Sequence, residues 1–102
     1  MWVWVLFDLP VLTSAERKRA TRFRNDLLDL GFEMVQFSVY LRYAWSKEKA
    51  ESYARQVGDL VPYPGHVQVL FVTDKQYALS QVFHGKGRPK APAEKPAQLV
   101  LL

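Results

Sequence analysis

The carboxylate of Asp8 is the first group in the chain whose position suggests chemistry. It ends the apolar run 2–8 and is followed by Leu9 and Pro10. Such a residue commonly caps backbone N–H groups where a strand turns. Alternatively it is a metal ligand, although one carboxylate is a poor site because Mg²⁺ takes octahedral oxygen ligands and keeps several waters. Two copies of Asp8, brought together by a two-fold dimer, could share a hydrated Mg²⁺ that positions water against a phosphodiester.

A cluster of cations between residues 16 and 24 is the second candidate. It contains five cations and one acid, so its charge equals the net charge of +4 of the whole chain. The five cations are Arg17, Lys18, Arg19, Arg22 and Arg24. They occupy the first half of a predicted helix, where the helix dipole disfavours positive charge by about 0.3–1 kcal/mol per well-placed group. Either they form a solvated helix face, or they and the helix N-terminus bind phosphate groups.

A second group of cations lies near the end of the chain. Lys86, Arg88 and Lys90 belong to the Pro- and Gly-rich segment 85–97. This segment is either a solvated linker or a flexible arm that adds secondary contacts to backbone phosphates.

Isolated polar residues give weaker signals. The hydroxyls of Ser38 and Tyr40 are either ordinary polar positions of a sheet or, if their strand borders the strand 2–8, groups that reach Asp8 or a phosphate. His66 and His84 lie at or near strand ends and are expected to be structural or exposed. The chain contains no arrangement of nucleophile, base and orienting group, no phosphate-binding P-loop and no Gly-rich dinucleotide loop.

Hydrophobic periodicity predicts the elements that must position these groups. The predicted strands are 2–8, 34–42 and 66–73, and the predicted helices are 15–30 and 47–60. A short extended piece is expected near 80–84, and 98–102 is predicted to be a further strand. The loop 43–45 is too short for a further strand before the second helix unless the strand 34–42 bends there.

Two helices over one largely antiparallel sheet give an α+β, ferredoxin-like βαββαβ sandwich. We expect this domain to span 1–84, followed by the linker 85–97 and the strand 98–102. Because strand 2–8 is apolar on both faces, the sheet needs cover on both faces. Two helices cover one of them, so the other is predicted to pack on a second copy of the chain by two-fold symmetry.

Composition narrows the classes of function. The 102 residues include no cysteine, which excludes disulfides, thiolate nucleophiles and Cys-based zinc sites. No apolar run approaches the length of about 20 residues that a membrane span requires. The apolar beginning of the chain lacks the basic flank of a signal peptide. We therefore expect a cytoplasmic protein that has no membrane partner.

Several segments resemble the second CRISPR-associated protein family, in order and spacing, over nearly the whole chain. They are Phe7-Asp8-Leu9-Pro10, the Arg-rich helix that closes in Leu30-Gly31-Phe32, Met34–Tyr40, Gly65–Leu70 and Thr73–Gln76. The resemblance implies a ferredoxin-like homodimer in which the last strand, here 98–102, joins the sheet of the partner.

The resemblance also implies functional roles. The strand-end aspartate of the family maps onto Asp8, and two such residues would face each other at the dimer interface and bind Mg²⁺. The phosphate-contacting arginines of the family's first helix map onto the cluster Arg17–Arg24. Some members are metal-dependent endonucleases on RNA or duplex DNA. In spacer acquisition the dimer bridges two dimers of the CRISPR integrase and holds the protospacer duplex, and there the aspartate is not generally needed for chemistry.

Three functions follow as hypotheses. The first is a CRISPR adaptation subunit that binds duplex DNA, or RNA, through phosphate contacts. The second is a Mg²⁺-dependent endonuclease that uses the Asp8 pair. The third is a ferredoxin-like assembly or sensor module that binds no nucleic acid.

Overall fold

The computed structural model describes residues 1–85. The predicted linker 85–97 with Lys86, Arg88 and Lys90, and the predicted strand 98–102, lie outside the described residues except for Gly85. The elements in chain order are β1 (Trp2–Asp8), α1 (Ser14–Asp29), β2 (Glu33–Gln36), β3 (Val39–Tyr43), α2 (Lys47–Leu60), β4 (His66–Val72) and α3 (Asp74–Ala78). None of the helices in this part of the chain is long and apolar enough to cross a membrane.

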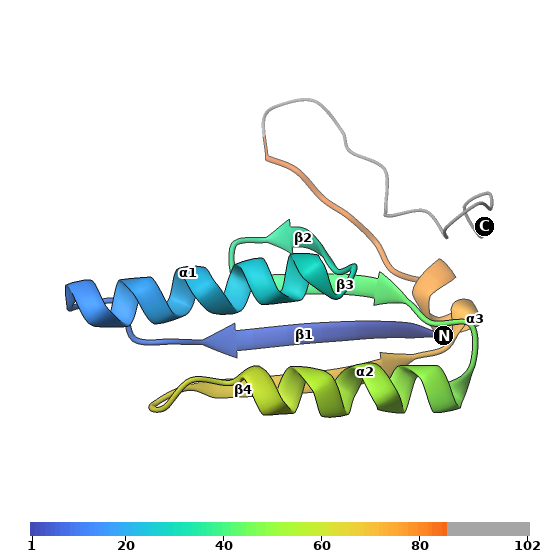
Figure 1. Ribbon diagram of the computed structural model, residues 1–102. Coiled ribbons are helices and arrows are strands. Elements are labelled where there is room, and N and C mark those ends of the chain that lie inside the picture. The colour runs from blue at the N-terminus through green and yellow to red at the C-terminus, as the bar shows by residue number, and fades with distance from the viewer. Residues whose placement is uncertain (86–102) are drawn as a thin grey trace.

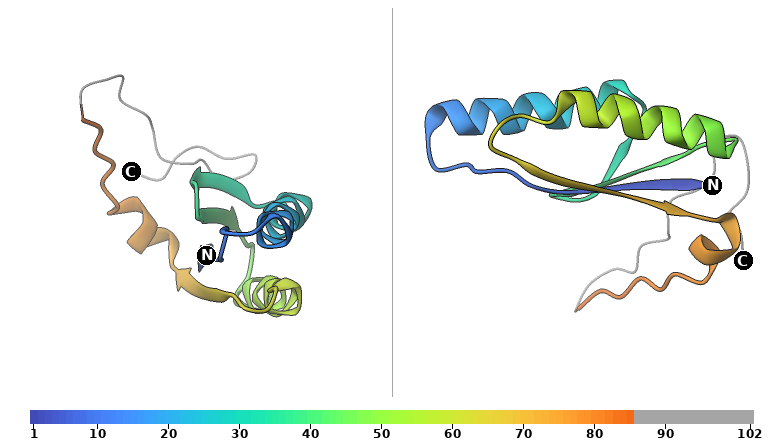
Figure 2. Two further views of the ribbon diagram at one scale, coloured as in Figure 1. Left: turned by 90° about the vertical axis from the view of Figure 1, so that its left-hand side faces the viewer. Right: turned by 90° about the horizontal axis from the view of Figure 1, so that it is seen from below.

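Four strands form one antiparallel sheet in the order β2-β3-β1-β4, so β1 is a central strand. Figure 1 shows α1 and α2 running along the strands, and Figure 2 shows that both lie on the same side of the sheet. This arrangement confirms the ferredoxin-like α+β fold. The predicted bounds of β1, α1, α2 and β4 differ from the observed ones by no more than one residue at each end.

The main core lies between these helices and the sheet. Side chains from alternate positions of β1, namely Val3, Val5 and Phe7, pack against the stripe on α1 that the periodicity predicts. The buried members of that stripe are Ala20, Phe23 and Leu27. The rings of Phe7 and Phe23 meet edge to face, with centroids 5.1 Å apart.

The segment predicted as one strand, 34–42, is a hairpin, so the single-strand prediction was wrong. The chain turns at Phe37 and Ser38 and returns as β3, with a register irregularity between Met34 and Gln36. As a result Phe37 is exposed, whereas Tyr40 packs in the main core. The alternation of apolar residues misled the prediction because it continues through a turn that contains no Gly, Pro or Asn.

A short helix that the sequence analysis did not predict, α3, follows β4, and the extended piece predicted near 80–84 belongs to no strand of the sheet. Thr73 and Gln76 form a reciprocal capping box at its start. Tyr77 of α3 stacks on Trp2, with centroids 4.2 Å apart and planes at 22°. Figure 2 shows α3 on the side of the sheet opposite to α1 and α2. The second face of the sheet is therefore partly covered within the chain.

Arg42 ties the end of α1 to the rest of the fold. Its guanidinium donates to the carbonyl oxygens of Leu30 and Tyr43 and lies 4.0 Å from the centroid of the Tyr53 ring in α2. Gly31, with a φ of +89°, lets the chain leave α1 beside this guanidinium. A Cβ atom at Gly31 would also collide with the Arg42 guanidinium, which would have to shift, so the positive φ and this close approach both favour glycine here.

Two glycine substitutions test this anchor. Gly31→Ala should lower the free energy of unfolding by about 1–2 kcal/mol, because alanine is strained at positive φ and its Cβ displaces Arg42. Gly58→Ala is the control: Gly58 lies in α2, and a Cβ atom there would meet nothing within 4 Å. This change should raise stability by about 0.5–1 kcal/mol. Urea unfolding measures both, and equal effects of the two substitutions would contradict the proposed anchor.

Candidate nucleic-acid interface

The start of α1 is fixed by a capping box. The Thr13 hydroxyl accepts a hydrogen bond from the Glu16 N–H (3.1 Å), and the Glu16 carboxylate accepts from the N–H groups of Thr13 (2.9 Å) and Leu12 (3.0 Å). The hydrogen bond from the Thr13 N–H is the main reason that the pKa of Glu16 lies below its usual value. The loop between β1 and α1 is thereby held against the first turn of the helix.

Arg17 strengthens the same junction from the other side. Its Nη1 donates to the carbonyl oxygens of Val11 (3.2 Å) and Leu12 (3.0 Å). These two bonds use one nitrogen of the guanidinium, whose other nitrogens make no hydrogen bond within residues 1–85. The Arg17 side chain is thus exposed but oriented.

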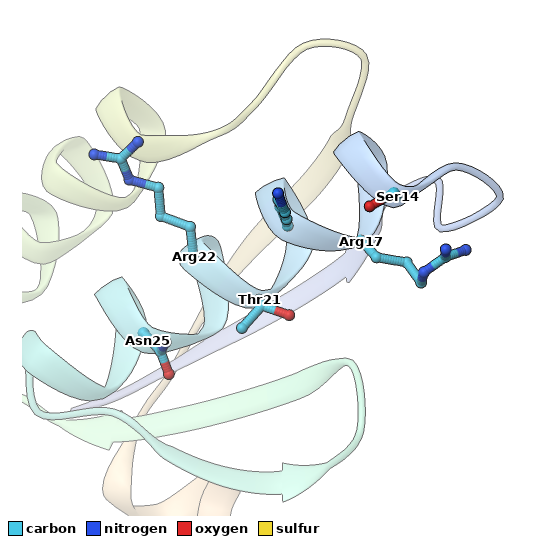
Figure 3. Close-up of a pocket in the computed structure, with 6 residues that line it drawn as sticks. Ser14, Arg17, Thr21, Arg22 and Asn25 are labelled. Atoms are coloured by element: carbon cyan, nitrogen blue, oxygen red, sulfur yellow. The ribbon is translucent and has the colours of Figure 1, made fainter.

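An open hollow runs along the exposed face of α1. It is lined by Ser14, Arg17, Lys18, Thr21, Arg22 and Asn25. These positions lie on the helix face opposite to the buried stripe. Figure 3 shows Arg17 directed toward the loop that precedes the helix and Arg22 directed toward α2. Three cations with hydroxyl and amide groups between them, and no acid in the lining, suit the binding of phosphate oxygens.

The five predicted cations therefore occupy three different environments. Arg17, Lys18 and Arg22 line the hollow, whereas Arg19 is exposed beside Glu16 and helps to lower its pKa. Arg24 is half-buried, and its guanidinium lies 4.3 Å from the centroid of the Phe37 ring in the hairpin turn. Arg24 thus packs the hairpin turn against α1, and it does not line the hollow.

Ion pairing does not neutralise these cations. Within residues 1–85 none of the five forms an ion pair, whereas the α-amino group of Met1 pairs with Asp74 at 2.9 Å. Two acids do lie at helical spacing from these cations, Glu16 three residues before Arg19 and Asp26 four residues after Arg22, but neither forms an ion pair with them. The segment 16–24 holds five cations and one acid, so the first half of α1 presents net positive charge to solvent.

Asp8 is exposed at the end of β1, as the sequence predicts, and its register partner on β4 is His66. The alternative in which the Tyr40 hydroxyl reaches Asp8 is not observed. Tyr40 is 2% exposed and packs on the helix-covered face, because β3 pairs with β1 in a register that sets it opposite Val5. The other residue of that alternative, Ser38, accepts a hydrogen bond at its carbonyl oxygen from the Phe7 N–H, at 3.1 Å.

The donor set at Asp8 fits Mg²⁺ only when a second chain contributes. Among the residues that the structure describes, no three His, Cys, Asp or Glu side chains lie together as a metal site would need. One exposed carboxylate supplies one anionic oxygen ligand, whereas Mg²⁺ in proteins is typically held by one or two carboxylates together with waters and phosphates. Two copies of Asp8 would meet that requirement.

Sequence reasoning missed some residues of the hollow. Ser14, Thr21 and Asn25 share the face of Arg17 and Lys18, since they follow one another at helical spacing. Applying the same spacing to the polar positions, and not to the apolar stripe alone, would have found them. His66, the residue opposite Asp8, could be identified only from the register between β1 and β4, which the sequence alone does not reveal.

Comparisons with known proteins agree with this fold and this order of elements. The model of the family CRISPR associated protein Cas2 matches residues 1–79. A Paracidovorax avenae protein is 53% identical over 93% of this chain and 86% of its own length. A Parvibaculum lavamentivorans protein is 45% identical over 99% of each chain. Both relatives carry the name CRISPR-associated endoribonuclease Cas2.

Solved structures share the fold at lower identity. The crystal structure of Streptococcus pyogenes Cas2 at pH 6.5 superposes with a TM-score of 0.60 at 16% identity, over 82% of this chain and all of that one. A second structure, described as the crystal structure of cas2, gives a TM-score of 0.54 at 24% identity, over 94% of this chain and 97% of that one. From the family match and the two relatives we conclude that the chain belongs to the CRISPR-associated Cas2 family.

Proposed function

We propose that this chain is a CRISPR adaptation subunit that forms a homodimer, binds duplex protospacer DNA through its phosphates and bridges integrase dimers during spacer acquisition. The observation that carries the proposal is the hollow on α1, in which Arg17, Lys18 and Arg22 meet no acid. Membership of the Cas2 family supports the CRISPR context.

The chemistry of the hollow favours phosphate contacts over base recognition. Guanidinium and ammonium groups bind phosphate oxygens and thereby release condensed counterions, which gives affinity without sequence preference. The hollow is open and lies on the exposed face of α1. Such a surface suits a backbone that passes over it, whereas it would not enclose a small ligand.

The proposed dimer forms through the face of the sheet that α1 and α2 leave uncovered. Leu70 of β4, opposite Trp4 of β1, lies on this face and is 51% exposed. The hollow and this face lie on opposite sides of the sheet, so each protomer would carry its hollow on its own outer side. One duplex would then meet both protomers by crossing the end of the dimer at which α1 begins.

A charge-matched pair of variants tests the hollow. Replacing Arg17, Lys18 and Arg22 with glutamine should weaken duplex binding at least tenfold. It should also reduce the slope of log K against log[salt] by about 0.9 for each phosphate that the protein no longer neutralises. The control replaces three cations of α2, namely Lys47, Lys49 and Arg55, with glutamine. Titration of a labelled duplex of about 30 base pairs at several salt concentrations measures both quantities.

Three results would contradict the proposal. Equal reductions of affinity in the two triple variants would mean that net charge, and not the hollow, sets affinity. An unchanged salt slope in the α1 variant would exclude phosphate contacts by these residues. Failure of the wild-type protein to bind a duplex at low salt would favour an assembly or sensor module that binds no nucleic acid.

A second candidate function is a Mg²⁺-dependent endonuclease on RNA or DNA. The observation that favours it is the name endoribonuclease carried by relatives of up to 53% identity. Asp8 from each of two chains would hold the ion, which when bound supplies Lewis-acid activation of water. Asp8 is exposed and lies on the face proposed to meet the second copy, so its carboxylate is available for this role.

Asp8→Asn separates binding from cleavage. The variant should bind the duplex as tightly as the wild type, because Asp8 lies outside the hollow, and any cleavage should fall to the level seen with EDTA. Gel analysis of RNA and DNA substrates, with the duplex titration alongside, gives both readings. Cleavage that persists in Asp8→Asn would exclude the Asp8 pair as its source.

A further inference from the structure

His66 lies directly opposite Asp8 in the antiparallel pair of β4 with β1. Directly opposed residues have Cβ atoms about 4.5–5.5 Å apart and point to the same face of the sheet. Trp2 and Trp4 of β1 and Val72 of β4 pack in the cluster on the face away from α1 and α2. Because side chains alternate along a strand, Asp8 and His66 point to that same face.

Both side chains are exposed and available. Within residues 1–85, neither makes a hydrogen bond or an ion pair with another group through its side chain. His66 is thus exposed, one of the two alternatives that the sequence predicts for it. The carboxylate and the imidazole are therefore both free to bind a ligand from the same face of the sheet.

We propose that Asp8 and His66 form one half of a binding site for a transition-metal dication, and that the same pair from a second copy completes it. The inference rests on the dimer of the proposed function. Two carboxylate oxygens and two imidazole nitrogens would supply four protein ligands and leave the remaining positions to water or phosphate oxygen. No single chain reaches the three donors of a metal site among its described residues.

The imidazole changes which ion the site prefers. Mg²⁺ is a hard ion that takes oxygen ligands, and nitrogen ligands favour first-row transition metals over it. A site made of Asp8 alone would bind Mg²⁺ and Mn²⁺ similarly. A site that includes His66 should bind Mn²⁺ more tightly than Mg²⁺, and the difference should come from His66.

Binding of Mn²⁺, followed by electron paramagnetic resonance, tests this directly and needs no cleavage assay. We expect about one Mn²⁺ per wild-type dimer, with ¹⁴N couplings in the pulsed spectrum that report imidazole coordination. His66→Gln should remove the couplings and lower Mn²⁺ affinity at least tenfold, while Mg²⁺ affinity, measured by competition, changes no more than about twofold. His84→Gln, the same change at the other histidine of the chain, should alter neither. Asp8→Asn should abolish binding of both ions.

Sedimentation of the same samples distinguishes the ways in which the proposal can fail. A dimer that binds no Mn²⁺, or whose ¹⁴N couplings survive in His66→Gln, would overturn the site and leave the dimer and duplex binding intact. Disappearance of the couplings in His84→Gln would show that the nitrogen ligand is the other histidine and would overturn the proposed pair. A monomeric wild-type protein would overturn both the dimer and the site, whereas duplex binding is measured independently through the α1 variants.

Discussion

The two-sided hydrophobicity of β1 is the constraint on which the rest of the structure depends. Val3 and Val5 point to α1 and α2, while Trp2 and Trp4 point to the other face. Burial of apolar surface stabilises by about 25 cal/mol per Å², so neither face can be left in water without a large loss of stability. Two helices cover one face of the sheet. On the other face, Tyr77 covers Trp2 at the start of β1, and the end of β1 that carries Asp8 is left uncovered.

Because the helices cover only one face of the sheet, the two candidate sites lie on opposite sides of the molecule. The hollow on α1 lies on the outer side of the helix layer, where the capping box and Arg17 fix the first turn. Cations there cost the isolated helix about 0.3–1 kcal/mol each against its dipole, a cost that a bound polyanion would reverse. Asp8 and His66 lie on the opposite side of the sheet. Substitutions can therefore test the proposed nucleic-acid binding and the proposed metal binding independently.

Sequence patterns predicted the helices and strands over which one apolar pattern continues without a break. The apolar stripe of α1 and the β-branched run of β1 gave bounds within one residue of those observed. The hairpin was missed because its turn, at Phe37 and Ser38, contains no Gly, Pro, Asn or Asp and the apolar alternation continues through it. Of the candidate site, the cationic cluster and Asp8 were found by charge and position. The stacking of Arg24 and the pairing of Asp8 with His66 were not, since both depend on strand register, which is a tertiary property.

The oligomeric state is the most direct test of the account, because it asks whether the uncovered part of the sheet meets a second copy. Leu70 on this face and Leu28 on α1 are 51% and 50% exposed, so Leu70→Glu and Leu28→Glu add the same charge at equally accessible sites. Sedimentation equilibrium should show a dimer for the wild type and for Leu28→Glu, and a folded monomer for Leu70→Glu. A monomeric wild type, or a dimer that persists in Leu70→Glu, would contradict the account.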